Sequence, residues 1–223
     1  MVKALAYSPY GGRNDNIHPF EPLFEKKINP SISNTLAGAS ALLLWGGEDI
    51  NPAFYRQKAH PSNDCAKMTA ISHRDMMEWH MIKEAHRLGV PIIGVCRGAQ
   101  LLCAYAGGSL IQDVNGHFSG HEITTYDGLS MHAPANHHQM MNPTNTTYEL
   151  LAWTDKPLST HYYEEDNVSI ETPLFKAGCD PEVIWFSEIK GLAIQPHPEW
   201  GPADSQFNKW CLETIRKYVL KED

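Results

Sequence analysis

The stretch Val90-Pro-Ile-Ile-Gly-Val-Cys96-Arg-Gly98-Ala-Gln100 decides the fold class, because it places a cysteine between an apolar run and a helix-forming run. Gly94 and Gly98 flank Cys96 at i−2 and i+2, where a strand turns sharply into a helix and Cβ atoms would collide. This is a nucleophile-elbow pattern with cysteine in the place of serine. Unpaired N–H groups at a helix start favour a thiolate, so Cys96 is a candidate covalent nucleophile. A buried structural cysteine is the alternative interpretation.

A second candidate lies near the other end of the chain. The short apolar run 192–195 predicts a strand that leads into Pro196-His197-Pro198-Glu199-Trp200. Proline on both sides holds the backbone of His197 extended, which suits a positioned side chain. A histidine followed two residues later by a carboxylate supplies a general base and a group that orients it. Cys96, His197 and Glu199 each follow a predicted strand, and together they form a candidate catalytic triad.

The composition limits the class of protein. The 223 residues suit one domain over residues 1–223, and the net charge of −8 without a basic stripe argues against direct nucleic-acid binding. No apolar run approaches the ~20 residues of a membrane span, and the N-terminus indicates a first strand, not a signal peptide. The five cysteines are odd in number and lack metal-ligand spacing, so we expect a reducing, cytoplasmic setting.

Hydrophobic periodicity predicts strands that alternate with helices. Ser72 and Asp75 resemble a capping box, and Met77, Met81, Ala85 and Leu88 follow at helical spacing as a core-facing stripe. The pattern predicts a three-layer α/β/α domain with a mostly parallel central sheet, whose ligands bind at the carboxyl ends of the strands. The last two strands are expected to form a hairpin. Strands are expected at 2–8, 41–45, 109–114, 148–153, 182–186 and 191–195, and further helices at 20–28, 97–106 and 204–219.

Residues 115–139 are dense in histidine and are predicted to be mostly loop. His117 and His121 have i, i+4 spacing, but Phe-Ser-Gly between them is poor helix material, and Glu122 does not complete an H-E-x-x-H frame. Scattered histidines are an unspecific signal, so we expect no metal and no cofactor. The remaining histidines of this segment are His132, His137 and His138.

Several motifs fall in the order found in one known family, and the chain resembles the class I glutamine amidotransferase superfamily. The branch that it resembles most is the γ-glutamyl hydrolases that cleave γ-glutamyl-γ-aminobutyrate (peptidase C26). The resemblance runs from about Gly46 to Trp200. Its motifs are Gly46-Gly-Glu-Asp-Ile-Asn-Pro52, Arg74-Asp75, Gly94-Val-Cys-Arg-Gly-Ala-Gln-Leu-Leu102, Gly107-Gly-Ser-Leu-Ile-Gln-Asp113, His137-His-Gln139 and Gln195-Pro-His-Pro-Glu-Trp200.

This resemblance implies the roles of the site residues. Cys96 would attack the γ-carbonyl of a glutamine-like side chain, His197 would take the thiol proton and return it to the leaving amine, and Glu199 would orient His197. The backbone N–H groups of Gly47 and Arg97 would form the oxyanion hole. Water would hydrolyse the thioester and release glutamate. Gln100 would contact the substrate, and the segment with His137 and His138 would line the glutamyl pocket mainly through backbone.

The chain also departs from the family pattern. Trp45 stands where the family usually has proline, and an apolar residue replaces a glutamate in the strand before His197. These departures leave the leaving amine undefined. Other interpretations stay open: a glutaminase subunit that supplies ammonia to a separate synthetase, a non-catalytic binding or regulatory relative, and a protease or glyoxalase with a cysteine elbow. A homodimer is also compatible with the sequence.

Overall fold

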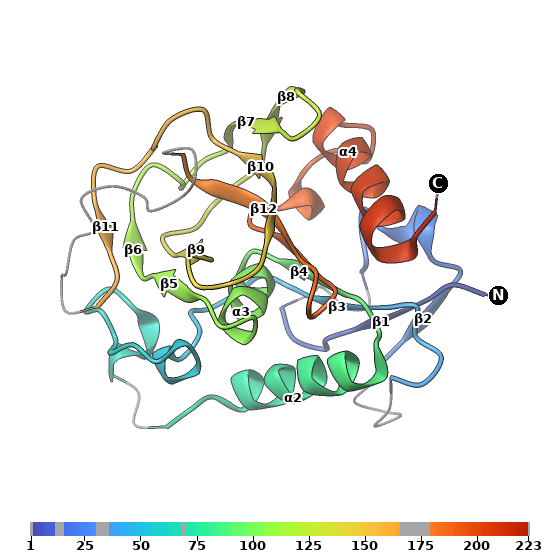
Figure 1. Cartoon of the computed structure of the whole chain (residues 1–223), viewed down its shortest axis with the longest axis horizontal. Coiled ribbons are helices and arrows are strands. Elements are labelled where there is room, and N and C mark those ends of the chain that lie inside the picture. The colour runs from blue at the N-terminus through green and yellow to red at the C-terminus, as the bar shows by residue number, and fades with distance from the viewer. Residues whose placement is uncertain (1, 12–15, 30–35, 68–69, 166–178, 223) are drawn as a thin grey trace.

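The computed structural model describes residues 2–11, 16–29, 36–67, 70–165 and 179–222. The central sheet of this part of the chain has nine strands in the order β2-β1-β3-β4-β13-β12-β10-β7-β8 (Figure 1). The bounds of the elements are β1 Ala4–Tyr7, β2 Lys26–Ile28, β3 Ala41–Leu44, α2 His73–Leu88, β4 Ile92–Val95, α3 Arg97–Tyr105, β5 Ser109–Ile111, β6 Asp113–Val114, β7 His121–Thr125, β8 Ser130–Ala133, β9 Met140–Asn142, β10 Glu149–Trp153, β11 Tyr162–Tyr163, β12 Pro181–Phe186, β13 Gly191–Ile194 and α4 Gln206–Thr214.

The strands around β4, which leads into Cys96, are parallel. β2, β1, β3, β4 and β13 pair in parallel, whereas β12, β10, β7 and β8 continue the sheet with antiparallel pairing. The expected hairpin of the last two strands is confirmed as β12–β13. Because β3, β4 and β13 are neighbours and parallel, their carboxyl ends meet at one edge.

Helices cover both faces of the sheet, which confirms the α/β class and its three layers (Figure 1). Leu5 and Leu43 point to the face covered by α4, where they pack with Phe207 of that helix. Leu42, the neighbour of Leu43, points to the opposite face and packs with Met81 of α2. This alternation along the strands is the period-two pattern of a sheet buried on both sides. No helix among the described residues has the length and apolar character needed to cross a bilayer.

Three sequence-based expectations about local structure are wrong. Residues 20–28 do not form a helix: a 3-10 turn at Glu21–Leu23 leads into edge strand β2, which pairs with β1. Phe20 instead stacks on Trp45 in the core, with ring centroids 5.9 Å apart. Residues 109–114 form two short strands that join different small sheets. The predicted loop at 115–139 contains the β7–β8 hairpin, which extends the sheet.

Helix α2 begins at its predicted cap, where the backbone N–H of Asp75 donates to Ser72 Oγ at 3.0 Å. Its inner face is only partly apolar. Met81 and Ala85 are buried as predicted, but Leu88 is 41% exposed. Charged residues, Arg74, Asp75 and Glu78, take the place of apolar side chains on the first two turns of the buried face. These charges lie beside the candidate site.

Candidate active site

Cys96 lies on a sharp turn between β4 and α3, as the elbow pattern predicts. Its backbone has φ 50° and ψ −107°, a conformation that non-glycine residues seldom adopt. A Cβ on Gly94 would lie 2.4 Å from the carbonyl oxygen of Gly98, so the tight turn requires glycine there. The backbone N–H of Cys96 donates to Ile194 O at 2.8 Å, which fixes the elbow to β13.

The pairing of β4 with β13 brings His197 to the same edge of the sheet. The backbone N–H of His197 donates to Pro134 O at 2.7 Å, which holds the residue in place. Its Nδ1 lies 2.7 Å from Glu199 Oε1, and its ring also hydrogen-bonds with Cys96. Cys96 and His197 are 6% and 5% exposed. The three side chains are therefore connected in the order thiol, imidazole, carboxylate.

The environment of His197 favours its protonated form. Burial lowers the pKa of the imidazole, but the hydrogen bonds and charges of Cys96 and Glu199 outweigh burial and raise this pKa to about 9. Trp200 stacks on the ring at a centroid separation of 3.7 Å and an interplanar angle of 1°. The face of an indole attracts a cation, so this contact acts in the same direction. At neutral pH His197 is an imidazolium able to protonate a leaving group.

This charge state predicts a pH dependence of kcat/KM. The folded-state pKa of His197 lies above its ordinary value of 6.5, so the imidazolium is present at neutral pH and is lost as the pH rises through about 9. We expect kcat/KM to fall across that range. Glu199→Gln removes one of the two groups that raise this pKa, and it should move the falling limb to lower pH.

A surface carboxylate supplies the control for this prediction. Glu188 lies exposed on the β12–β13 turn, so Glu188→Gln makes the same charge change away from His197. In this control variant, kcat/KM should fall over the same pH range as in the wild type. If the fall of kcat/KM with pH occurs at the same pH in Glu199→Gln as in the wild type, the coupling of His197 to Glu199 is contradicted.

The loop that follows β3 closes over the imidazole. A Cβ on Gly46 would lie 2.9 Å from His197 Cε1 and 3.4 Å from Cys96 Cβ. Gly47 has φ 147°, and a Cβ there would lie 2.2 Å from Arg74 Nη1. Arg74 Nη2 donates to Trp45 O at 3.1 Å and to Gly46 O at 2.9 Å. Arg74 therefore anchors the loop, and only glycine fits between the guanidinium and the triad.

A cavity of about 400 Å³ opens beside His197 and Glu199, with a volume suited to a small ligand, and Cys96 is not part of its lining. The Gly46-Gly47 loop forms one wall. His197, Glu199 and Trp200 form another part of the lining. The guanidinium of Arg74 also faces this cavity, beside Glu48, to which it donates at 2.9 Å. The cavity could therefore receive a polar substrate next to the imidazole.

The other predicted site residues lie at the start of α3 and in the segment before β9. Arg97 is the first residue of α3, so its backbone N–H is free of a helical partner, while its fully buried side chain forms ion pairs with Asp75 and Glu78. Gln100 Nε2 donates to Gln139 O at 2.9 Å.

The two histidines of that segment lie in different surroundings. His137 is buried, and its ring contacts the ring of His117, with centroids 4.7 Å apart. His138 Nε2 lies 3.0 Å from Asp49 Oδ1. The described contacts do not join the side chains of His137 and His138 to those of Cys96, His197 and Glu199.

Sequence reasoning assigned no supporting role to Arg74, Asp75, Glu78 or Trp200, although Arg74-Asp75 and Trp200 stand in the quoted family motifs. Arg74 anchors the glycine loop, Asp75 and Glu78 bind the side chain that follows the nucleophile, and Trp200 covers His197. The i, i+4 spacing of Arg74 and Glu78 in a helix otherwise expected to face the core was an available signal. The predicted strand before His197 did not indicate that Trp200 stacks on the His197 ring. This contact depends on the 3-10 turn at Pro198–Trp200.

The chain is similar in sequence to known proteins. The Peptidase C26 family model matches residues 22–172. The candidate glutamine amidotransferase Rv2859c of Mycobacterium tuberculosis is 31% identical over 201 residues, which are 86% of this chain and 61% of that protein. Protein NtpR of Enterococcus hirae is 30% identical over 172 residues, which are 71% of this chain and 66% of that protein. The chain thus spans less than two thirds of the length of either relative.

Solved structures share the fold at low sequence identity. A candidate GMP synthase subunit from Thermoplasma acidophilum has a TM-score of 0.62 at 16% identity, with 99% of this chain and 96% of that chain covered. The acivicin-bound glutaminase domain of Trypanosoma brucei CTPS has a TM-score of 0.57 at 12% identity, with 100% and 95% covered. Identities this low show the fold alone.

Proposed function

This chain belongs to the peptidase C26 family of the class I glutamine amidotransferase superfamily, and from that premise we propose that it hydrolyses a γ-glutamyl amide bond. The observation that supports this proposal most strongly is the connected order of Cys96, His197 and Glu199 at the nucleophile elbow. Glutamine or a γ-glutamyl amine would be the substrate. The products would be glutamate and ammonia or an amine.

In the first half of the proposed reaction, His197 holds the thiol proton of Cys96, and the sulfur attacks the γ-carbonyl carbon so that a C–S bond forms. The carbonyl π electrons move to oxygen, where the backbone N–H groups of Gly47 and Arg97 donate to the oxyanion. Such donors contribute about 3–4 kcal/mol of transition-state stabilisation. The C–N bond then breaks, and the His197 imidazolium gives its proton to the leaving amine. A γ-glutamyl thioester and a neutral imidazole remain.

In the second half, water attacks the thioester while neutral His197 accepts a proton from it. The C–S bond breaks and glutamate leaves. This step regenerates the thiolate and the imidazolium. Glu199 keeps Nδ1 of His197 hydrogen-bonded throughout, so that Nε2 faces the reacting groups. Gln100, His137 and His138 belong to the proposed glutamyl pocket, in which the segment 137–139 would contribute mainly backbone groups.

The test is glutamate release from the purified protein with free glutamine and with a panel of γ-glutamyl amines. We expect one γ-glutamyl amine to be cleaved faster than glutamine, because the family branch acts on such substrates. The same assay with Cys96→Ala measures background hydrolysis. Glutamate release that is equal in the variant and the wild type would refute the proposal.

A second candidate is a glutaminase subunit that passes ammonia to a separate synthetase. Two structural neighbours are named as such proteins, a glutaminase domain and a candidate GMP synthase subunit, and their likeness to this chain supports the shared fold alone. An inactive isolated protein whose Cys96 still reacts with a glutamine-like electrophile would support this candidate. We also propose a cytoplasmic setting, where all five cysteines would stay as the unpaired thiols seen in the structure.

A further inference from the structure

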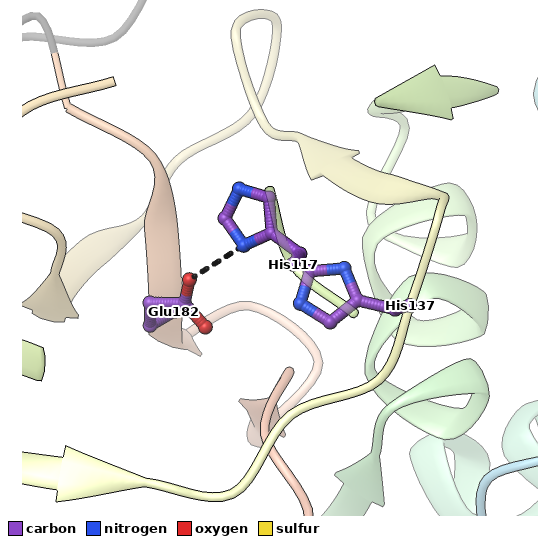
Figure 2. A group of neighbouring side chains, drawn as sticks. All are labelled: His117, His137 and Glu182. Carbon is purple, nitrogen blue, oxygen red and sulfur yellow. Dashed lines mark ion pairs between the residues drawn. The ribbon is translucent and has the colours of Figure 1, made fainter. Parts of the chain in front are cut away.

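A second cluster of titratable side chains lies apart from the triad. His117 follows β6, His137 precedes β9, and Glu182 belongs to β12 (Figure 2). All three are buried, and one nitrogen or oxygen atom from each lies within 4.8 Å of the others. Residues separated by 20 and 45 positions in the sequence are thus brought to one point. The triad does not use any of them.

Each member directs an atom without a hydrogen-bond partner into this point. These atoms are His117 Nδ1, His137 Nε2 and Glu182 Oε2, which lack such partners within the described part of the chain. His117 Nδ1 faces the carboxylate and lies 3.5 Å from Glu182 Oε1, the contact dashed in Figure 2. His117 Nδ1 thus has an ion pair but no hydrogen bond, and His137 Nε2 and Glu182 Oε2 have no hydrogen-bond partner. Buried polar atoms are normally satisfied, so the convergence of these atoms indicates a missing ligand.

The opposite side of each group is held by a second contact. His117 Nε2 lies 3.0 Å from Asp180 Oδ2, and His137 Nδ1 lies 2.9 Å from Gln139 O. Glu182 Oε1 lies 2.8 Å from His121 Nε2. A carboxylate or a carbonyl on one ring nitrogen holds a proton there, and the other nitrogen can bind a ligand when it carries no proton. In His117 the ion would take the place of the Nδ1 proton that faces Glu182. Metal-bound histidines have this outer arrangement.

From this geometry we propose that His117 Nδ1, His137 Nε2 and Glu182 Oε2 bind a divalent transition-metal ion of the zinc class. Two imidazoles and a carboxylate suit zinc, whereas calcium and magnesium prefer oxygen ligands alone. The cluster also holds two buried carboxylates, Asp180 and Glu182, whose negative charges a dication would balance. Zn–N and Zn–O bonds of about 2.0–2.2 Å would draw the ligand atoms closer together.

The proposed ion would have a structural role. The inference that it binds does not depend on the proposed hydrolysis. It would join β12 to the segment 134–139, which reaches the active site in two places. Pro134 O accepts the backbone N–H of His197, and Gln139 O accepts from Gln100 of α3. An ion at this point would therefore hold the segment 134–139, which contacts both His197 and Gln100.

The test is zinc binding by the full chain, read out by metal content. Protein treated with a chelator, given equimolar zinc and desalted should retain about one zinc per chain by mass spectrometry of the metal. The experiment is repeated in Cys96→Ala, because the Cys96–His197 pair could itself hold zinc. We expect the zinc to remain in Cys96→Ala. In His137→Gln and Glu182→Gln, the bound zinc should fall at least tenfold.

His132→Gln is the matched control, since His132 lies on β8 with a side chain that is 62% exposed. It should retain the zinc. Two further readouts do not depend on the ligand variants folding. Zinc at 100 times its dissociation constant should raise the Tm of Cys96→Ala by at least about 5 °C. Cobalt in that variant should give d–d bands without a thiolate charge-transfer band.

The proposal is overturned if Cys96→Ala retains no zinc and its Tm does not respond to the ion. In that case a water molecule, or a proton on His117 between its two carboxylates, would satisfy the cluster. Retention of zinc by both folded ligand variants, or a cobalt–thiolate band in Cys96→Ala, would also overturn it, because the ion would then lie elsewhere.

Discussion

Replacing Cys96 with alanine should lower kcat/KM for the best γ-glutamyl substrate by on the order of 10⁴-fold or more, because no other group in the site can form the thioester. The fold should survive, since the elbow is held by backbone contacts such as the one from Cys96 N to Ile194 O. Cys96→Ser should also be inactive, because a hydroxyl is a much weaker nucleophile than a thiolate beside an imidazolium. The measurement is glutamate release, with circular dichroism to verify the fold.

Cys65→Ala supplies the matched control for this result. Cys65 is also a buried thiol, but its Sγ hydrogen-bonds to Asp49 O and not to His197. This variant should keep turnover close to that of the wild type. Activity retained by a folded Cys96→Ala would exclude Cys96 as the nucleophile.

Glu78→Gln should lower the free energy of unfolding by about 3–5 kcal/mol, because it removes one charge from a buried ion network. Glu78 is fully buried and accepts from Arg97, from Arg74 Nε at 3.3 Å and from Ser8 Oγ at 2.6 Å. The loss leaves the buried guanidinium of Arg97 with Asp75 as its remaining carboxylate partner. We expect Tm to fall by roughly 10 °C in thermal denaturation.

The control for this variant is Glu84→Gln on the same helix. Glu84 forms an exposed i, i+3 pair with Arg87, and such surface pairs contribute little to stability. Its Tm should stay near that of the wild type. Equal Tm values for Glu78→Gln and Glu84→Gln would show that the buried network does not stabilise the link between α2 and the elbow.

The sequence predicted those parts of the molecule that depend on local chemistry. The elbow needs small residues at Gly94 and Gly98 whatever lies around it, and the structure shows the close approach that explains them. The cap at Ser72 is equally local. The parallel placement of the strands before Cys96 and His197 followed from the order of strands and helices.

The sequence did not predict features that depend on distant partners. The segment at 26–28 is a strand because β1 offers it an edge, and nothing within 20–28 shows this. The i, i+4 spacing of Arg74 and Glu78 indicates an ion pair, but their burial depends on Arg97, which pairs with Glu78 only in the folded chain. His117 and His137 could not be joined to Glu182 by spacing, because β12 reaches them only through the folded sheet.

The most direct test of the proposed chemistry is to trap the acyl-enzyme. The protein would be mixed with its best γ-glutamyl substrate, quenched in acid within the first turnovers and analysed by intact and peptide mass spectrometry. The proposed mechanism predicts a mass gain of one γ-glutamyl group on the peptide that carries Cys96, absent from Cys96→Ala. Turnover that proceeds with no adduct on Cys96, or with the adduct on another residue, would contradict it.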